Sequence, residues 1–302
     1  MLRYLWAKTT AISVLSFGLL VLPSPSAIAE TVLEKIDRTG KLTAGTSKDA
    51  LPFAYRNESG ELVGYSIDML SLIVAQLEAE LDREIDLELV ALQPKERIPE
   101  LIDGKVDIVC DASSFTWKRD RQVDFSFSYS STGTRLLTRR GNDFWDAESL
   151  AGKRIGALAK TTNEKSIRLA QPKAEMVIFK DRAAGYEALE QDKIDAFSSD
   201  GILLESWLNN TPNRREFQIV GDYSREGIAC MMQQNNSQLL NIVNYSLVKF
   251  MQGFLNDKPE YVTIFERWFG SQGVLPLTKD LENIMIDNMQ LLIDFKDQIA
   301  EE

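Results

Sequence analysis

Two stretches of the chain share one pattern: residues 101–109 read LIDGKVDIV, and residues 189–197 read LEQDKIDAF. Each indicates the end of a helix, a tight turn and a buried strand. A polar run follows each strand, DASS at residues 111–114 and SSD at residues 198–200. Such units occur in many α/β folds, and in open α/β sheets ligands bind beyond the carboxyl ends of the strands. Both polar runs are therefore candidate binding loops, and two such domains facing each other would form a cleft.

Short β-branched runs alternate with amphipathic stretches on both sides of these units, which is typical of α/β proteins. We expect a strand at Lys41–Thr46 and then a helix capped by the hydroxyl of Ser66, because apolar residues follow it at helical spacing. A second series starts near Leu150, with a strand at Arg154–Leu158 and a helix at Thr162–Ala170. A length of 302 residues also favours two domains.

The composition is that of an acidic globular protein. The formal net charge is −11, with 44% hydrophobic and 26% charged residues. A negative surface repels phosphate backbones and anionic lipids, so we expect neither nucleic-acid binding nor adhesion to a membrane. Charge of this kind keeps a protein soluble and says little about its ligand.

The first 29 residues have the pattern of a cleavable signal peptide. Arg3 and Lys8 precede an apolar stretch at Ala11–Leu22, and the small-residue triplet Ala27–Ala29 stands before Glu30. The apolar stretch is shorter than a spanning helix, which disfavours the alternative of an uncleaved anchor. No cysteine lies near the junction, so we do not expect a lipid anchor. The sequence predicts export to the periplasm as a soluble protein.

The chain contains no histidine and only two cysteines, Cys110 and Cys230. A zinc site and histidine-dependent catalysis are therefore not expected. An oxidising compartment permits a disulfide, although two separate buried thiols are equally compatible with the sequence.

Four further stretches carry a resemblance to a known family. They are DIVCDASSFTWKRDRQVDFS at residues 107–126, GTRLLTRRG at 133–141, GKRIG at 152–156 and FERWFG at 265–270. In these four stretches the chain resembles the periplasmic polar amino-acid-binding proteins of ABC transporters (solute-binding protein family 3). Within that family it is most similar to the glutamate/aspartate-binding branch, as in LPFAY at residues 51–55. The resemblance covers essentially the whole chain after the signal peptide.

The resemblance implies a two-lobed periplasmic binding protein of type II, with two hinge strands and a cleft between the lobes. We place lobe 1 at residues 30–138 plus 223–302 and lobe 2 at residues 139–222, after a signal peptide at residues 1–29. It implies a monomer without cofactor or metal, which binds an amino acid and delivers it to an ABC-transporter permease.

The resemblance also assigns the groups that hold the ligand's α-carboxylate. Arg119 matches the family arginine whose planar fork binds two carboxylate oxygens, and Ser114 matches a hydroxyl donor to the same group. Thr161 and Thr162 begin a helix in the second lobe, whose free N–H groups favour an anion.

For the α-ammonium the resemblance implies two acceptors. Ala112 matches a position whose backbone carbonyl faces the ammonium, and Asp200 matches an aspartate that pairs with it. Both charged groups of an amino acid lose water on binding, so each requires charge-assisted hydrogen bonds in return.

Recognition of the ligand side chain is expected at Ser47, Arg97 and Arg182. Ser47 replaces the arginine that meets the distal carboxylate in the glutamate/aspartate branch. Arg97 matches a basic residue of that branch, and Arg182 falls where it has a histidine. Two cations near the distal end favour glutamate, aspartate or glutamine over a basic ligand.

Three further expectations follow from the resemblance. The branch has cysteines at both places, which implies a Cys110–Cys230 disulfide within lobe 1. We expect no enzymatic activity, but an alternative is a cyclohexadienyl or arogenate dehydratase on the same fold, for which Glu164 or Asp111 could supply the acid or base. A receptor's sensing part is disfavoured, since no transmembrane stretch follows residue 300.

Overall fold

A computed structural model describes residues 30–294 of the chain. The signal peptide that we expect at residues 1–29 lies outside the described residues. Two five-stranded sheets and one small three-stranded sheet make up the β-structure of the described part. In that same part, no helix combines the length and apolar character needed to cross a membrane.

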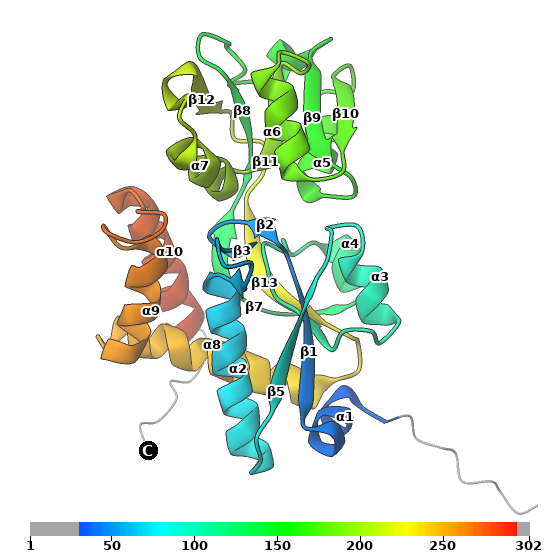
Figure 1. Cartoon of the computed structure of the whole chain (residues 1–302), viewed down its shortest axis with the longest axis vertical. Helices are drawn as coiled ribbons and strands as arrows, with labels where there is room; N and C mark the ends of the chain where they lie inside the picture. The colour runs from blue at the N-terminus through cyan, green and yellow to red at the C-terminus, as the bar shows by residue number, and fades with distance from the viewer. Residues whose placement is uncertain (1–29, 295–302) are drawn as a thin grey trace, which may run out of the picture. The chain divides into compact units, whose positions relative to one another are not determined.

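The first five-stranded sheet has the strand order β5-β1-β6-β13-β7 and mixes parallel with antiparallel pairs (Figure 1). Its strands are β1 Lys41–Thr46, β5 Asp86–Ala91, β6 Ile108–Val109, β7 Asp124–Thr132 and β13 Glu226–Met232. The helices that accompany it are α1 Val32–Thr39, α2 Tyr65–Leu81, α3 Arg97–Ile102, α4 Trp117–Asp120, α8 Ser237–Leu255, α9 Pro259–Phe269 and α10 Lys279–Asp294. The small sheet contains β2 Asp49–Ala50, β3 Ala54–Arg56 and β4 Leu62–Val63. One large apolar core joins the sheet to α2, α8, α9 and α10.

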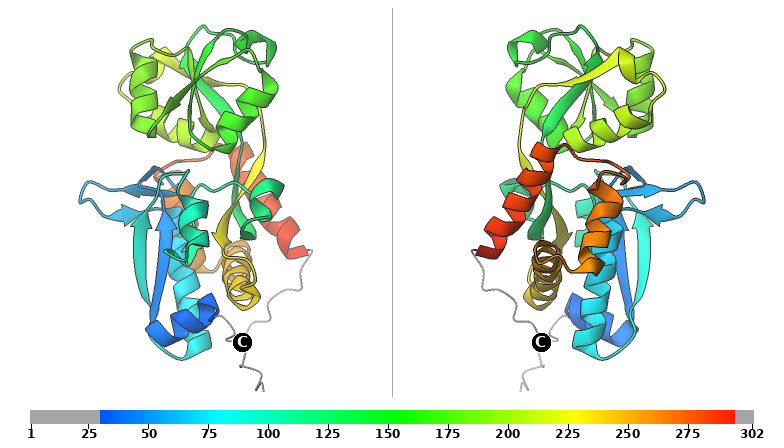
Figure 2. Two further views of the ribbon diagram at one scale, coloured as in Figure 1. Left: turned by 90° about the vertical axis from the view of Figure 1, so that its right-hand side faces the viewer. Right: turned by 90° about the vertical axis from the view of Figure 1, so that its left-hand side faces the viewer.

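The second five-stranded sheet has the order β10-β9-β11-β8-β12. Its strands are β8 Thr134–Arg139, β9 Arg154–Leu158, β10 Glu175–Phe179, β11 Ala196–Asp200 and β12 Phe217–Val220. Helices α5 Thr162–Ala170, α6 Arg182–Glu190 and α7 Gly201–Asn210 accompany it, with short 3-10 turns η1 Glu148–Leu150 and η2 Arg214–Glu216. Two smaller apolar clusters form its core. Figure 2 shows this sheet with its helices from two further sides.

The chain passes between the two large sheets twice, at Gly133 and at residues 221–225. These two crossing segments lie against each other: Thr134 N–H donates to Ser224 Oγ at 3.0 Å, and Tyr223 N–H donates to the Thr134 carbonyl at 2.9 Å. A side chain at position 133 would stand 2.0 Å from the Ser224 carbonyl oxygen, so the approach requires glycine. The lobe boundaries that we set at residues 138 and 223 stay a prediction.

The repeated sequence units form equivalent structures in the two sheets. Asp107 accepts from Thr43 N–H at 2.9 Å and from Lys35 Nζ at 2.7 Å, while Asp195 accepts from Arg154 N–H at 2.7 Å and pairs with its guanidinium. Each aspartate thus ties the start of the buried strand to the neighbouring parallel strand, which explains the shared K-x-D pattern.

The expected cap at Ser66 was wrong. The helix begins at Tyr65, and the cap position is Gly64 at φ 150°, two residues before the one that we predicted. A side chain at position 64 would approach the Phe53 carbonyl within 2.0 Å. That closeness lets the backbone carbonyls of Pro52 and Phe53 accept from Tyr65 N–H and Ser66 N–H, both at 2.9 Å, so no side-chain cap is needed.

Candidate functional site

The first candidate binding loop, at residues 111–114, and the start of α5 meet through side chains. Ser114, which follows the end of β6, places its hydroxyl 3.4 Å from the hydroxyl of Thr162 in the first turn of α5. Arg119 lies at α4 and donates to the Ser114 carbonyl at 2.8 Å and to the Lys160 carbonyl at 3.4 Å. The predicted carboxylate-binding residues therefore gather in one place, although they come from both sheets.

The Arg119 guanidinium lacks a carboxylate partner. Among residues 30–294, no aspartate or glutamate lies within ion-pair distance of it. Burial lowers the pKa of this guanidinium, and the positive charge of Arg97 acts in the same direction. A negative group that arrived here would relieve both effects, because an opposite charge stabilises the ionised form.

The N-terminus of α5 supplies further hydrogen-bond donors. Thr161 caps the helix, since its hydroxyl accepts from Glu164 N–H at 3.1 Å and its carbonyl from Lys165 N–H at 3.3 Å. The N–H groups of Thr162 and Asn163 have no protein acceptor within the described range. Together with the helix dipole, they favour an anion at this end.

Asp200 ends β11 and is buried, with 4% of its surface exposed. Asn163 Nδ2 donates to its carboxylate at 3.3 Å, and no lysine or arginine of residues 30–294 forms an ion pair with it. Burial raises the pKa of Asp200 to about 6, Glu226 adds to that rise, and Arg182 opposes it. A buried carboxyl group without a cation is suited to receive one from a ligand.

The residues expected to recognise the ligand side chain form a buried network of their own. Arg97 pairs with Asp111 at 2.7 Å and donates to Ser47 Oγ at 2.7 Å and to Ser113 Oγ at 3.3 Å. Ser47 in turn donates to Asp111 at 3.0 Å. The positive charge of Arg97 is therefore matched within the protein, and its assignment to the ligand, with that of Ser47, stays a prediction.

Arg182 is matched in the same way. Its guanidinium pairs with Asp49 Oδ1 at 2.6 Å, and only 4% of the residue is exposed. Arg182 begins α6 and Asp49 lies in β2, so the contact links the helices of the second sheet to the small sheet. Neither distal cation retains an unbalanced charge.

Three residues at the site were missed as partners by the sequence analysis: Asp49, Asn163 and Glu226. We placed Asp111 in a candidate binding loop and considered it as a possible catalytic group, but we did not predict its ion pair with Arg97. Asp49 had a similar signal, since it follows β1 by three residues. For Asn163 and Glu226 the sequence offers no comparable signal, because both act across elements that are distant in the chain.

The predicted disulfide is confirmed. Cys110 directly follows β6, Cys230 lies in the neighbouring antiparallel strand β13, and their Cα atoms are 4.4 Å apart. The bond fixes the chain immediately before Asp111 and Ala112, where Ala112 is buried with 5% of its surface exposed. The polar loop therefore starts from a covalently fixed position.

Known proteins share this architecture. Residues 42–271 match the family described as bacterial extracellular solute-binding proteins, family 3. The glutamate/aspartate import solute-binding protein of Salmonella typhimurium is 27% identical over 292 residues, which is 94% of this chain and 95% of that protein.

Two solved structures are similar as well. An ancestral arginine-binding protein bound to glutamine is 28% identical, with a TM-score of 0.68 over 77% of this chain and 99% of the other. An ancestral amino-acid-binding protein, a precursor of cyclohexadienyl dehydratase, is 24% identical, with a TM-score of 0.67 over 79% and 99%. The fold and the placement of polar loops thus define a two-lobed α/β binding protein of type II. The chain belongs to the bacterial extracellular solute-binding proteins of family 3.

Proposed function

We propose that this protein captures a free amino acid with a polar side chain outside the cytoplasmic membrane and delivers it to an ABC-transporter permease. One observation carries the proposal. Arg119 and Asp200 have opposite charges and lack ion-pair partners in the described chain, whereas Arg97 and Arg182 nearby are both paired. A zwitterion supplies both missing charges at once.

In this proposal the α-carboxylate binds the Arg119 guanidinium, with the Ser114 hydroxyl and the N–H groups at the start of α5 as further donors. The α-ammonium pairs with Asp200 and donates to the Ala112 carbonyl. Charge-assisted hydrogen bonds of this kind offset the loss of water from both groups.

The ion pairs refine the proposed choice of side chain. Because Asp111 and Asp49 balance Arg97 and Arg182, the distal part of the site carries no excess positive charge. An amide such as glutamine adds no charge there, while a buried distal carboxylate would need a cation of its own. Among glutamate, aspartate and glutamine, we therefore favour glutamine, with glutamate and aspartate as weaker ligands.

A thermal-shift screen of the standard amino acids tests this function, since a ligand that binds only the folded state raises the melting temperature. Glutamine compared with glutamate, and asparagine with aspartate, gives two pairs that differ only in distal charge. We expect glutamine, glutamate and aspartate to raise the melting temperature. Lysine, arginine and leucine should leave it unchanged. A shift with arginine alone would refute the proposed distal environment, and no shift with any amino acid would refute the function.

Binding should weaken in acid because Asp200 must be ionised to pair with the ammonium. With its pKa raised to about 6, Asp200 is mostly ionised at pH 7.5 and mostly protonated at pH 5. We expect about tenfold weaker binding at pH 5, measured by calorimetry. The raised pKa also affects the stability of the ligand-free protein, in the direction opposite to its effect on binding. The contribution of Asp200 to the free energy of unfolding is complete below about pH 4 and is lost as the pH rises through about 6.

Controls separate Asp200 from its charged neighbours, which are Glu226, Arg182 and Arg97. Glu226 is the one carboxyl group among these three neighbours, so the matched control changes Glu226. Asp200→Asn should bind weakly at both pH values and lose the pH dependence, whereas Glu226→Gln should retain it. Equal affinity of the unmodified protein at pH 5 and pH 7.5 would exclude the proposed role of Asp200.

The cellular setting is proposed with the function. Removal of residues 1–29 as a signal peptide would release a soluble, monomeric protein into the periplasm without a lipid anchor. The intact mass of the exported protein tests this, because cleavage after Ala29 leaves Glu30 at the N-terminus.

A dehydratase is the second candidate, favoured by the fold shared with the precursor of cyclohexadienyl dehydratase. The two carboxylates that we considered for it are engaged: Glu164 accepts from Lys160 N–H at 2.8 Å and pairs with Arg168 at 3.0 Å, and Asp111 pairs with Arg97. Incubation with prephenate and with arogenate distinguishes the two, and turnover of either would favour the enzyme.

A further inference from the structure

The C-terminal helix α10 lies beyond the residues that match the family. The match ends at residue 271, whereas α10 spans Lys279–Asp294. The helix packs against α8 and β7, and it buries Met285, Met289 and Ile293 in the large core (Figure 2). It is therefore an integral part of the fold that the matched family segment does not include.

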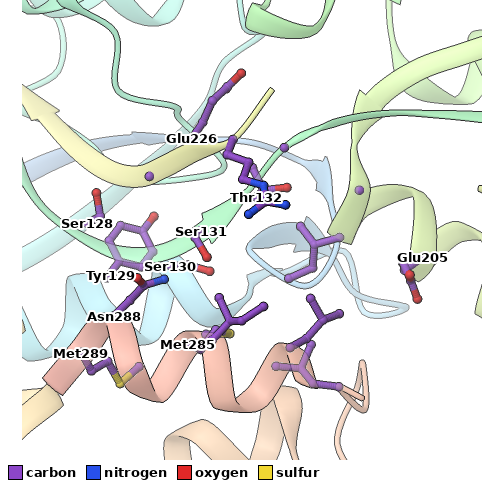
Figure 3. A pocket seen from close by; sticks show the side chains of 18 of the residues that line it. Ser128, Tyr129, Ser130, Ser131, Thr132, Glu205, Glu226, Met285, Asn288 and Met289 are labelled. Atoms are coloured by element: carbon purple, nitrogen blue, oxygen red, sulfur yellow. The ribbon is translucent and has the colours of Figure 1, made fainter. Parts of the chain in front are cut away.

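A cavity of about 790 Å³ lies between α10 and β7. The residues that line it also include Gly133, between the two large sheets, and Gly201 and Ile202 at the start of α7. The cavity is therefore lined by residues from both large sheets and their helices. Figure 3 shows Ser130 and Tyr129 of β7 above Met285 and Met289 of α10. A cavity of this volume fits a small organic molecule. It is separate from the amino-acid site, since neither Arg119 nor Asp200 lines it.

One wall of the cavity is apolar. Leu281, Ile284 and Leu291 follow one another at helical spacing along α10 and line the cavity, with 42%, 49% and 55% of their surfaces exposed. Exposed aliphatic side chains gathered along one helix stripe mark a binding surface more often than isolated ones do.

The opposite wall contains buried polar atoms without partners. Within residues 30–294, Ser130 Oγ, Thr132 Oγ1, Arg135 Nε and Glu226 Oε2 form no hydrogen bond, and all four residues line this cavity. Ser130 itself is 8% exposed. A buried polar atom without a partner is costly, and such a concentration at one cavity indicates a missing ligand group.

We propose that this cavity is a second binding site, which takes a neutral amphiphile with a hydrocarbon part and an amide or alcohol head group. The hydrocarbon part lies along the apolar stripe of α10. The head group accepts a hydrogen bond from Arg135 or Ser130 and donates one to Glu226.

The charges around the cavity select a neutral head group. Glu205, Glu226 and Asp222 line it together with Arg135 and Arg225, and Asp222 pairs with Arg225 at 3.1 Å. A carboxylate head would approach Glu226 and Glu205, and an ammonium head would approach Arg135. An amide both donates and accepts hydrogen bonds, which matches the unpartnered atoms without adding a charge.

Glu226 connects this cavity to the proposed amino-acid site. Glu226 is one of the residues that line the cavity, and its negative charge also acts on Asp200 and Arg119. A head group that donates to Glu226 should therefore change amino-acid affinity, and by reciprocity the amino acid should change amphiphile affinity. This linkage rests on the proposed function, whereas the cavity site does not.

The test uses the full chain and the fluorescent apolar probe N-phenyl-1-naphthylamine, displaced by decanamide, decanoate and decylammonium. These three share a chain and differ in head-group charge. We expect decanamide to displace the probe at a concentration about tenfold below that of the charged compounds, which corresponds to about 1.4 kcal/mol. Ile284→Asp should weaken the binding of decanamide by about tenfold or more, because it places a charge in the apolar wall.

Two variants keep the result interpretable. Leu169→Asp changes an aliphatic residue on α5 that is 71% exposed and lies outside the cavity lining, so it should not affect displacement. Ser130→Ala should weaken the binding of decanamide but not that of the probe, because it removes a head-group contact and keeps the apolar wall. No displacement by decanamide, tighter binding of decanoate, or equal effects of the changes at positions 284 and 169 would overturn the site.

The linkage is tested by glutamine calorimetry with and without saturating decanamide. We expect the affinity to change by about threefold or more, and the change to disappear in Glu226→Gln. An unchanged affinity would overturn the linkage. If no amino acid binds at all, the proposed function fails, while probe displacement still decides whether the cavity binds an amphiphile.

Discussion

Replacing Arg119 by alanine is expected to remove most amino-acid binding and to leave the fold intact. The guanidinium is the one charged donor that the proposed α-carboxylate would meet, and its own contacts are two backbone carbonyls. Loss of a buried charge partner costs about 2–5 kcal/mol, which corresponds to roughly thirty-fold to several-thousand-fold in affinity. Calorimetry with glutamine measures the effect.

Arg121→Ala is the matched control for that experiment. Arg121 lies two residues away and is exposed to solvent, so its removal should leave affinity unchanged. Asp200→Ala should weaken binding from the ammonium side to a similar extent. Unchanged affinity in both Arg119→Ala and Asp200→Ala would show that the ligand binds elsewhere.

Reduction of the Cys110–Cys230 disulfide is expected to destabilise the protein strongly while changing ligand affinity little. The bond joins residues 120 positions apart, and in the chain-entropy model a loop of that length stabilises the folded state by about 4–5 kcal/mol. For a protein of this size the melting temperature should fall by roughly 10 °C. Cys230 lies in β13 and Cys110 directly follows β6, both of the first sheet, so the bond does not restrain movement between the two sheets.

Differential scanning calorimetry with and without reductant measures the change. The double variant Cys110→Ser, Cys230→Ser provides the control, since it should melt at the reduced temperature under both conditions. Alkylation under denaturing, non-reducing conditions gives an independent check. Addition of two alkyl groups to the untreated protein, or an unchanged melting temperature on reduction, would contradict the prediction.

Local sequence was sufficient for three of the regular elements that we predicted. The strands Lys41–Thr46 and Arg154–Leu158 and the helix Thr162–Ala170 have the bounds that their patterns predict. Their signals are local: a β-branched run between turns, and a capping threonine before apolar residues at helical spacing. The start of α2 was predicted two residues late because its first N–H groups are satisfied by Pro52 and Phe53, which the helix pattern does not include.

At the candidate site, too, some features could be predicted from the sequence and others depend on tertiary contacts. The resemblance to the family predicted roles for Arg119, Ser114, Thr162 and Asp200, and the tertiary structure brings these residues together from both halves of the fold. Sequence could not show that Asp111 neutralises Arg97 or that Asp49 neutralises Arg182, because each balance depends on distances between loops far apart in the chain. The proposed preference for an amide therefore came only from the structure.

The sequence by itself determined that this is a two-lobed α/β protein of a binding-protein family, since periodicity and the motif-bearing stretches are properties of contiguous residues. The tertiary structure alone decided which charges remain unpaired and which polar atoms line the cavity beside α10. Electrostatic balance and burial depend on the surroundings of each group in three dimensions, and the order of residues along the chain does not contain them directly.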